Sequence, residues 1–247
     1  MVRRVTGRDE SHAADGDLAV QMIGLAGQRF IADRSGALYA AHAETLIVAD
    51  LHLEKGSAYA VRGRMLPPYD TRETLARLAA VIERFAPRRV VALGDSLHDG
   101  GAEARIDRAD LAALGEMQNG RDWVWVTGNH DRIIGGIFGG EVVDHIAIGS
   151  ITLRHEPAPR TLDVAIAEIA GHMHPAARLV NRGTSVRRPC FVDDGHRLVM
   201  PAFGAFAGGL NVLDAAFHPL FELQSMRVWM LGRDCVYPVP LAQLGGD

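Results

Sequence analysis

Seven side chains of the kind that bind divalent metal ions occur in five short segments of this 247-residue chain. Three of them offer an oxygen donor and four offer an imidazole. In chain order they are Asp50, His52, Asp95, Asn129, His155, His172 and His174. Seven ligands exceed the four of a tetrahedral zinc site, so the set predicts two divalent cations that share a carboxylate and keep room for water and substrate. The lack of a thiolate favours Mn, Fe or Zn in a reactive site over a structural zinc.

The spacing of these residues supports shared binding. Asp50 and His52 are separated by one residue, and His172 and His174 have the same spacing. On an extended chain such residues point to the same side, so Asp50 and His52 are expected to contact one cation together. Asp95 follows a predicted strand, and its two carboxylate oxygens make it the candidate bridge. Each segment alone can be an ordinary turn or a pair of surface histidines, but the whole set favours a site.

The elements that must position these residues are buried strands. Apolar runs at Thr45–Ala49, Arg89–Leu93 and Trp123–Thr127 are typical of strands buried on both faces. Helices are expected between them, one starting at Asp70 as its cap and ending before Pro87, the other over Asp107–Gln118. Strand and helix alternation begins an α/β layered fold. Ligands of open α/β sheets bind outside the carboxyl ends of the strands, where the five segments are expected to converge.

The rest of the chain is expected to form further strands. Gln28–Ala32 and Ala37–Ala40 flank a turn that contains Gly36 and predict a hairpin. The second half has short strand-like runs separated by Gly, Pro, Asn and Asp, typical of a mainly antiparallel sheet. These runs are Ser150–Arg154, Ala167–Ala170, Ala177–Val180, Pro189–Val192, Arg197–Met200 and Val228–Leu231. We expect a flexible N-terminal arm over residues 1–20 and one α/β domain of two sheets over residues 21–247.

Composition excludes several classes of protein. With 48% hydrophobic and 23% charged residues, the chain is expected to fold rather than remain disordered. Its apolar runs are far shorter than the roughly 20 residues of a membrane span, and no leader pattern is expected. Two cysteines cannot form a disulfide framework. We therefore expect a cytoplasmic protein without membrane partners. A net charge of −4 argues against a generally basic surface for nucleic acid. Lys55 is the only lysine, and arginine suits phosphate recognition.

The five segments, in this order, resemble the signature of the calcineurin-like metallophosphoesterases. The resemblance extends from Asp50 to His174, and no ligand position departs from the pattern. Flanking segments are similar to the bacterial subgroup called ligase-associated DNA damage response endonucleases; they are Asp50–Gly56, Leu66–Thr71, Gly94–Asp99 and Pro201–Gly204. The resemblance implies an α/β fold, an αββα sandwich of two sheets, with the site at the C-terminal ends of the strands.

The resemblance also implies a role for each residue. One metal would be held by Asp50, His52, Asp95 and His174, and the other by Asp95, Asn129, His155 and His172. Water activated by the cations would attack the phosphorus. His130 would contact a phosphate oxygen or protonate the leaving group, and Asp131 would orient its imidazole. Asn129 and His98 are further candidates for contact with the substrate.

The resemblance therefore implies a Mn²⁺-dependent endonuclease that acts on single-stranded DNA in repair. The donor set is also compatible with Fe and Zn, and the subgroup implies ligase or helicase partners. One alternative is a phosphatase or phosphodiesterase for nucleotides or other small esters. Another is a non-catalytic binding module, which should have lost ligands that this chain retains. An open groove lined by arginines would favour DNA, and a narrow pocket would favour a small substrate. Arginines near the segments are Arg62, Arg64, Arg132, Arg154, Arg160, Arg178 and Arg182.

Overall fold

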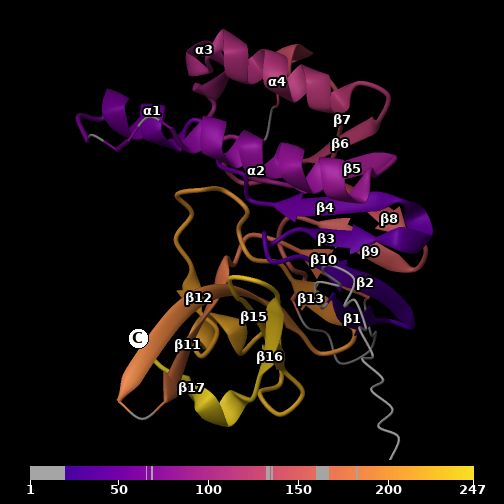
Figure 1. Ribbon diagram of the computed structural model, residues 1–247, viewed down its shortest axis with the longest axis vertical. Helices are drawn as coiled ribbons and strands as arrows, with labels where there is room; N and C mark the ends of the chain where they lie inside the picture. The colour runs from indigo at the N-terminus through magenta and orange to yellow at the C-terminus, as the bar shows by residue number, and fades with distance from the viewer. Residues whose placement is uncertain are drawn as a thin grey trace, which may run out of the picture.

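The computed structural model describes residues 20–64, 66–67, 69–131, 134, 136–159, 167–181 and 183–247. The arm predicted over residues 1–20 lies outside the described residues except for Val20. Within the described parts of the chain, the strands form two sheets, and the α-helices lie together along one of them (Figure 1). None of the described helices is long and apolar enough to cross a membrane.

The first sheet has seven strands in chain order among the described residues. They are β1 (Gln21–Leu25), β2 (Gln28–Ala32), β3 (Leu38–Ala40), β4 (Thr45–Ala49), β5 (Arg89–Leu93), β6 (Asp122–Val126) and β7 (Glu141–Val143). Strands β1 to β4 pair antiparallel, whereas β4, β5, β6 and β7 pair parallel. Parallel pairing places the carboxyl ends of β4, β5 and β6 at one edge. The predicted hairpin and the three predicted buried strands are confirmed, while β1 was not expected.

Helices cover the outer face of this sheet. They are α1 (Lys55–Val61), α2 (Asp70–Phe85), α3 (Ala102–Arg105) and α4 (Arg108–Gln118). Apolar residues of α2 and α4 pack against β4, β5 and β6 in one buried cluster. Asp107 caps α4 by accepting the N–H of Ala109. The expectation that Asp70 caps α2 is wrong: Tyr69 occupies the cap position, and the Asp70 carboxylate instead accepts the N–H of Gly56, 2.9 Å away in α1.

The second sheet has ten strands among the described residues. They are β8 (His145–Ile148), β9 (Ile151–Arg154), β10 (Glu168–Ala170), β11 (Pro175–Asn181), β12 (Thr184–Asp193), β13 (Arg197–Val199), β14 (Leu210–Asn211), β15 (Arg227–Leu231), β16 (Val236–Val239) and β17 (Leu244–Gly245). Most of its pairs are antiparallel, as predicted, but β10 runs parallel to both β9 and β13. The carboxyl ends of β9 and β10 therefore also meet at one edge. Short 3-10 helices are η1 (Ala41–Ala43), η2 (Gly136–Phe138), η3 (Ala215–Phe217) and η4 (Leu241–Gln243).

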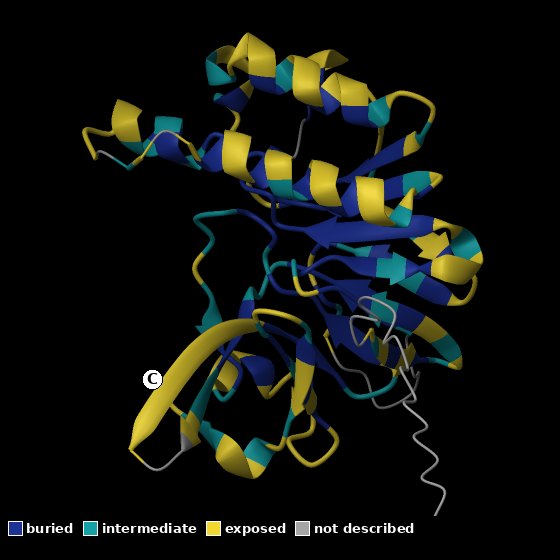
Figure 2. Ribbon diagram, in the orientation of Figure 1, coloured by how far each residue is buried: buried dark blue, intermediate teal, exposed yellow. Residues whose placement is uncertain are grey.

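The two sheets pack face to face through an apolar core. Phe30, Ile47 and Leu93 of the first sheet and Leu153 and Ile169 of the second belong to one buried cluster, and all are fully buried. Figure 2 shows this band of buried strands between the helical layer and the exposed outer half of β12. The structure is a mixed α/β sandwich of two sheets, as predicted, and the described α-helices all precede β6.

Candidate metal centre

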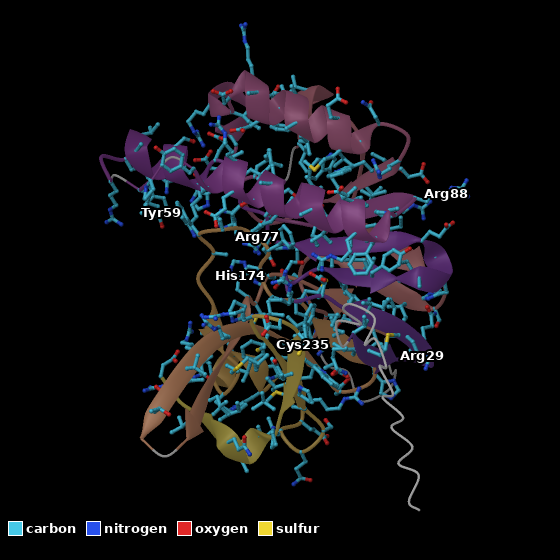
Figure 3. The ribbon with its side chains drawn as sticks, viewed as in Figure 1. Arg29, Tyr59, Arg77, Arg88, His174 and Cys235 are labelled. Carbon is cyan, nitrogen blue, oxygen red and sulfur yellow. The ribbon has the colours of Figure 1, made fainter. Side chains whose placement is uncertain are left out.

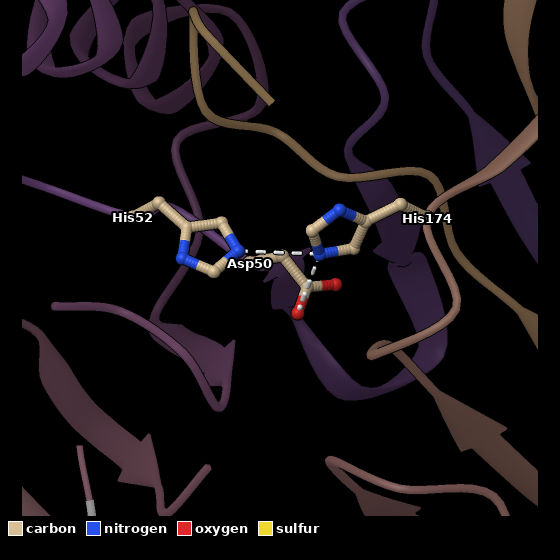
Figure 4. Close-up of side chains that lie close together, drawn as sticks. All are labelled: Asp50, His52 and His174. Carbon is tan, nitrogen blue, oxygen red and sulfur yellow. Dashed lines mark hydrogen bonds and ion pairs between the residues drawn. The ribbon is translucent and has the colours of Figure 1, made fainter. Parts of the chain in front are cut away.

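Asp50, His52 and His174 form the first cluster of metal-binding side chains (Figure 4). Asp50 and His52 follow β4, and His174 precedes β11. The Nε2 atoms of His52 and His174 are 3.2 Å apart, and Nε2 of His174 lies 3.3 Å from Oδ1 of Asp50. The Asp50 side chain is fully buried. A carboxylate and two imidazoles thus converge on one point from segments 122 residues apart in sequence.

Asp95, His155 and His172 form the second cluster. Nε2 of His155 lies 3.5 Å from Oδ2 of Asp95 and 3.2 Å from Nδ1 of His172. The side-chain amide of Asn129 is also 3.2 Å from Nδ1 of His172. Nδ1 of His155 lies 3.1 Å from the carbonyl oxygen of Leu93. If Nδ1 carries the proton and donates it there, Nε2 is free to face the cluster, the usual way in which a ligating histidine is oriented.

The two clusters adjoin each other. Oδ1 of Asp50, in the first cluster, is 3.7 Å from Nδ1 of His155 in the second. The Asp50 carboxylate also accepts the backbone N–H of His172, with an Oδ2 distance of 3.0 Å. The structure therefore brings together all the side chains that the sequence predicted as ligands, in two neighbouring groups.

Several of these residues have a left-handed backbone. The φ angles are 54° at Asp50, 45° at His52, 45° at Asp95, 68° at His172 and 45° at His174. The expectation of extended tails after the strands is therefore wrong. The chain turns sharply at these five donors, and hydrogen bonds between neighbouring loops hold it, including one of 2.9 Å from the His52 N–H to the Asp95 carbonyl. Such conformations cost about 1–3 kcal/mol each for residues other than glycine and concentrate at functional sites.

Glycines in the same segments allow the close packing of these loops. A Cβ atom at Gly128 would overlap the backbone nitrogen and carboxylate of Asp95, and one at Gly94 would overlap the ring of His155. Gly94 also has a positive φ of 66°, which glycine adopts without strain. The glycines that precede Asp95 and Asn129 in the sequence pattern are thus required by the space around the donors.

The charges of the clusters depend on their burial and on each other. Burial and the neighbouring His174 lower the pKa of His52 to about 3, so this imidazole is neutral at pH 7. Burial opposes ionisation of Asp95, but hydrogen bonds from the His155 side chain and the His130 N–H outweigh it and hold the pKa of Asp95 below its ordinary range. Burial lowers the pKa of His155, but the carboxylates of Asp95 and Asp50 raise it to about 9. Without metal, therefore, the second cluster contains an ion pair.

His130 stands beside the clusters rather than within them. Its side chain is 48% exposed, and its Nε2 lies 3.9 Å from Oδ2 of Asp95. Its ring stacks on that of His98, with centroids 5.5 Å apart and an angle of 21°. Its Nδ1 lies 3.0 Å from the His98 carbonyl oxygen. His130 thus sits at the accessible side of the centre, where a substrate would approach, and its ring covers the buried His98.

The prediction that Asp131 orients the His130 imidazole is wrong, because the Asp131 carboxylate makes other contacts. Its Oδ1 accepts the N–H groups of Asp95 and Gly128, at 3.1 and 2.9 Å. Its Oδ2 accepts those of Ser96 and Leu97, at 2.6 and 3.0 Å. Burial raises the pKa of Asp131 to about 6 against these bonds, so the carboxylate is mostly ionised at pH 7. Asp131 ties the loop after β6 to the loop after β5.

A network that the sequence did not indicate supports the loop after β4. Both oxygens of the buried Glu54 are engaged, Oε1 by the hydroxyl of Thr71 at 2.9 Å and Oε2 by that of Ser57 at 2.6 Å. Arg105 in turn donates to the Ser57 hydroxyl at 2.9 Å. These residues lie on α1, α2 and α3, so no local spacing marks them. They fix the start of α1 just beyond His52.

The arginines near the sequence motifs are mostly engaged elsewhere. Arg62 is paired with Asp99 and Arg154 with Glu168, each at 3.9 Å, while Arg64 is exposed. Arg178 donates to the Ser185 hydroxyl and the Gly246 carbonyl. Arg132, Arg160 and Arg182 lie outside the described residues. Among the described members of this set, Arg154 lies beside the centre, because it lines a cavity of about 400 Å³ together with Asn129 and His155.

Comparison with known proteins identifies the class of protein that this centre defines. Residues 44–181 match the calcineurin-like phosphoesterase family, and the chain belongs to that family. It is a metal-dependent phosphoesterase, with two clusters suited to divalent metals. The resemblance noted in the sequence is thereby confirmed.

Two solved structures are compared with this chain. The crystal structure of Pseudomonas putida nuclease MPE is 32% identical, matches 89% of this chain and 100% of its own, and has a TM-score of 0.68; this likeness supports the resemblance to the endonuclease subgroup. The phosphoesterase YfcE of Escherichia coli is 14% identical over 77% of this chain and 88% of its own, with a TM-score of 0.38. A search of curated proteins finds no match.

Proposed function

We propose that this protein is an endonuclease that hydrolyses phosphodiester bonds of single-stranded DNA at a two-cation centre, with Mn²⁺ as its working metal and DNA repair as its setting. The observation that carries the proposal is the pair of adjoining donor clusters with the accessible His130 beside them. The likeness to a nuclease of similar length supports the choice of a polymeric substrate. Ligase or helicase partners and a cytoplasmic location remain predictions.

The residues present fit two divalent cations. In each cluster two imidazole nitrogens approach within 3.2 Å of each other beside a carboxylate, an arrangement that a shared cation stabilises. We assign Asp50, His52, Asp95 and His174 to one cation and Asp95, Asn129, His155 and His172 to the other. Oxygen and imidazole donors without thiolate suit Mn²⁺, and also Fe and Zn. When bound, the cations supply Lewis acidity toward the phosphodiester and toward water.

His130 is assigned the proton transfer to the leaving oxygen. The carbonyl of His98 fixes the ring through Nδ1, so Nε2 points toward the open side of the centre near Asp95. A protonated Nε2 there can donate to a phosphate oxygen or to the departing alkoxide. General acid catalysis of this kind contributes about 10²–10⁴-fold. The exposed Asn129 and the stacked ring of His98 are proposed to contact the substrate from either side.

A phosphatase or phosphodiesterase for nucleotides or other small esters is the second candidate. The cavity beside Asn129 and His155, about 400 Å³ in volume, falls within the roughly 300–1,000 Å³ of small-ligand sites. Arg154 could bind a phosphate there, but Asp144 and Glu156 also line the cavity. Their negative charge disfavours a terminal phosphate dianion more than the monoanion of a diester.

One assay separates these functions. Metal-stripped protein is reloaded with Mn²⁺ and given a chromogenic phosphodiester, a chromogenic phosphomonoester and circular single-stranded DNA. The proposal predicts diester turnover and nicked circles, both lost in Asp95→Ala and both reduced in His130→Ala. Strong monoester turnover with intact circles would establish the small-ester enzyme instead. No hydrolysis of any of the three substrates with Mn, Fe or Zn would contradict both the endonuclease and the small-ester enzyme.

A further inference from the structure

Two cavities lead away from the metal centre on the side of His174. The first, about 160 Å³, is lined by His174 and by Arg187 and Arg188. The second, about 390 Å³, is lined by four arginines, namely Arg34, Arg77, Arg188 and Arg233. Both cavities share the residues Arg188, Pro189, Ala202 and Ala207. They therefore adjoin each other, and together they are called here the arginine groove, after Arg34, Arg77, Arg188 and Arg233.

The described residues of the arginine groove carry more positive than negative charge. Asp247 pairs with Arg187 at 3.0 Å, and Glu73 interacts electrostatically with Arg77. No described Asp or Glu lines either cavity, and none forms an ion pair with the four arginines. Arg34 and Arg77 donate only to backbone carbonyls, those of Arg233 at 2.8 Å and Ser35 at 3.0 Å. The side chains of Arg188 and Arg233 are exposed and have no hydrogen-bond partner among the described residues. On a chain of net charge −4, this concentration of guanidinium groups favours the binding of an anion.

The groove is held in a fixed place relative to the metal centre. Its wall is the segment 202–207, whose Phe203 and Gly204 N–H groups donate to the carbonyls of Ala49, at 2.8 Å, and Asp50, at 3.1 Å. The guanidinium of Arg77 lies over the Phe203 ring, 4.8 Å from its centroid. In the view of Figure 3, Arg77, from α2, lies above His174. The backbone of the proposed metal ligand Asp50 is thus hydrogen-bonded to the segment 202–207 that forms the groove wall.

We propose that the arginine groove binds the sugar–phosphate backbone of the single-stranded nucleic acid beside the scissile bond. The inference rests on the proposed function and adds the path of the strand to it. Guanidinium groups match phosphate oxygens with paired N–H donors, and a row of them suits a polyanion longer than one phosphate. The cavity beside Asn129 and His155 is lined by Asp144 and Glu156 as well as by Arg154, so the arginine groove past His174 is the more favourable path for the strand.

The test compares two pairs of substitutions in the full-length, Mn²⁺-loaded enzyme. Arg188→Gln with Arg233→Gln removes the two groove charges that make no described contact, so folding is preserved. Arg29→Gln with Arg88→Gln is the matched control, because both arginines are exposed and lie away from His174 (Figure 3). Each variant is given circular single-stranded DNA and a chromogenic phosphodiester, and kcat/KM is measured between 50 and 200 mM salt, roughly the range over which phosphate contacts weaken strongly.

The expected loss follows from counterion release. Each phosphate contact to a single strand contributes about −0.7 to the slope of log affinity against log salt, or about 5-fold at roughly 0.1 M salt. The groove variant should therefore lose about 25-fold in kcat/KM on DNA and about 1.4 in slope, with diester turnover unchanged and the control variant unaffected. An equal loss of kcat/KM on DNA in both variants, or no loss in the groove variant, overturns the proposed role of the arginine groove. Nicking of DNA by the wild-type enzyme would in that case still support the proposed endonuclease function. Wild-type enzyme that turns over the diester but leaves DNA intact overturns both.

Discussion

Replacing Asp131 by Asn distinguishes a structural role from a catalytic one. The Asp131 carboxylate accepts four backbone N–H groups, two at each oxygen. An Asn side chain offers one oxygen and one NH₂ group. In either orientation of the amide, two of the backbone N–H groups therefore face the NH₂ group, which cannot accept a hydrogen bond from them. Hydrogen bonds to a charged group contribute about 1.5–3 kcal/mol each, and the loss of two should cost about 3–6 kcal/mol. For a chain of this size, that lowers Tm by roughly 6–24 °C.

The measurement is thermal unfolding of the metal-free protein, with Asp122→Asn as the control. Asp122 is an exposed carboxylate, 61% accessible and 3.3 Å from Arg89, and a surface pair of this kind contributes only about 0–1 kcal/mol. Asp122→Asn should therefore leave Tm nearly unchanged. If Asp131→Asn also left Tm unchanged while reducing kcat on a phosphodiester, the carboxylate would be acting on His130 after all, and the structural assignment would be refuted.

Three further predictions follow from the site. Gly128→Ala should reduce phosphodiesterase kcat at least about 10²-fold, as misplacement of reacting groups does. Gly100→Ala should leave kcat unchanged, because its Cβ meets open space. Equal kcat values in the two variants would contradict the packing argument. His130→Ala should reduce kcat by about 10²–10⁴-fold without lowering Tm, because the side chain is half exposed; unchanged kcat would remove its assigned role. Adding Mn²⁺ at 100 times its Kd should stabilise metal-free protein in urea unfolding by about 2.7 kcal/mol for each bound cation, and Asp50→Asn should weaken that gain; a gain unchanged by Asp50→Asn would place the metal elsewhere.

The sequence predicts the strands of the centre well because their environment is simple. Thr45–Ala49 and Arg89–Leu93 have the observed bounds, since a strand buried on both faces must be apolar and must end where polar side chains begin. Short elements were missed for the opposite reason. α3 is a single turn of helix. In β1 the exposed Met22 stands next to the buried Ile23, so apolar and polar residues do not alternate clearly over its five residues.

The donors themselves are visible in the sequence, but their surroundings are not. Residue types at strand ends indicate which side chains converge, whereas the left-handed backbone at Asp50 and His52 depends on hydrogen bonds from loops distant in sequence. The contacts of Asp131 depend on the same loops. The arginine groove is the extreme case, because each of its arginines comes from a different part of the chain. The sequence analysis selected arginines that are near the motifs in sequence, and none of the four groove arginines was among them.

The central claim is that two divalent cations occupy the adjoining clusters. Anomalous diffraction from crystals of Mn²⁺-loaded protein, recorded on both sides of the manganese absorption edge, tests it most directly. The account predicts two manganese peaks, one among Asp50, His52 and His174 and one among Asp95, His155 and His172. A single peak shared by all these residues, or peaks remote from both clusters, would contradict it.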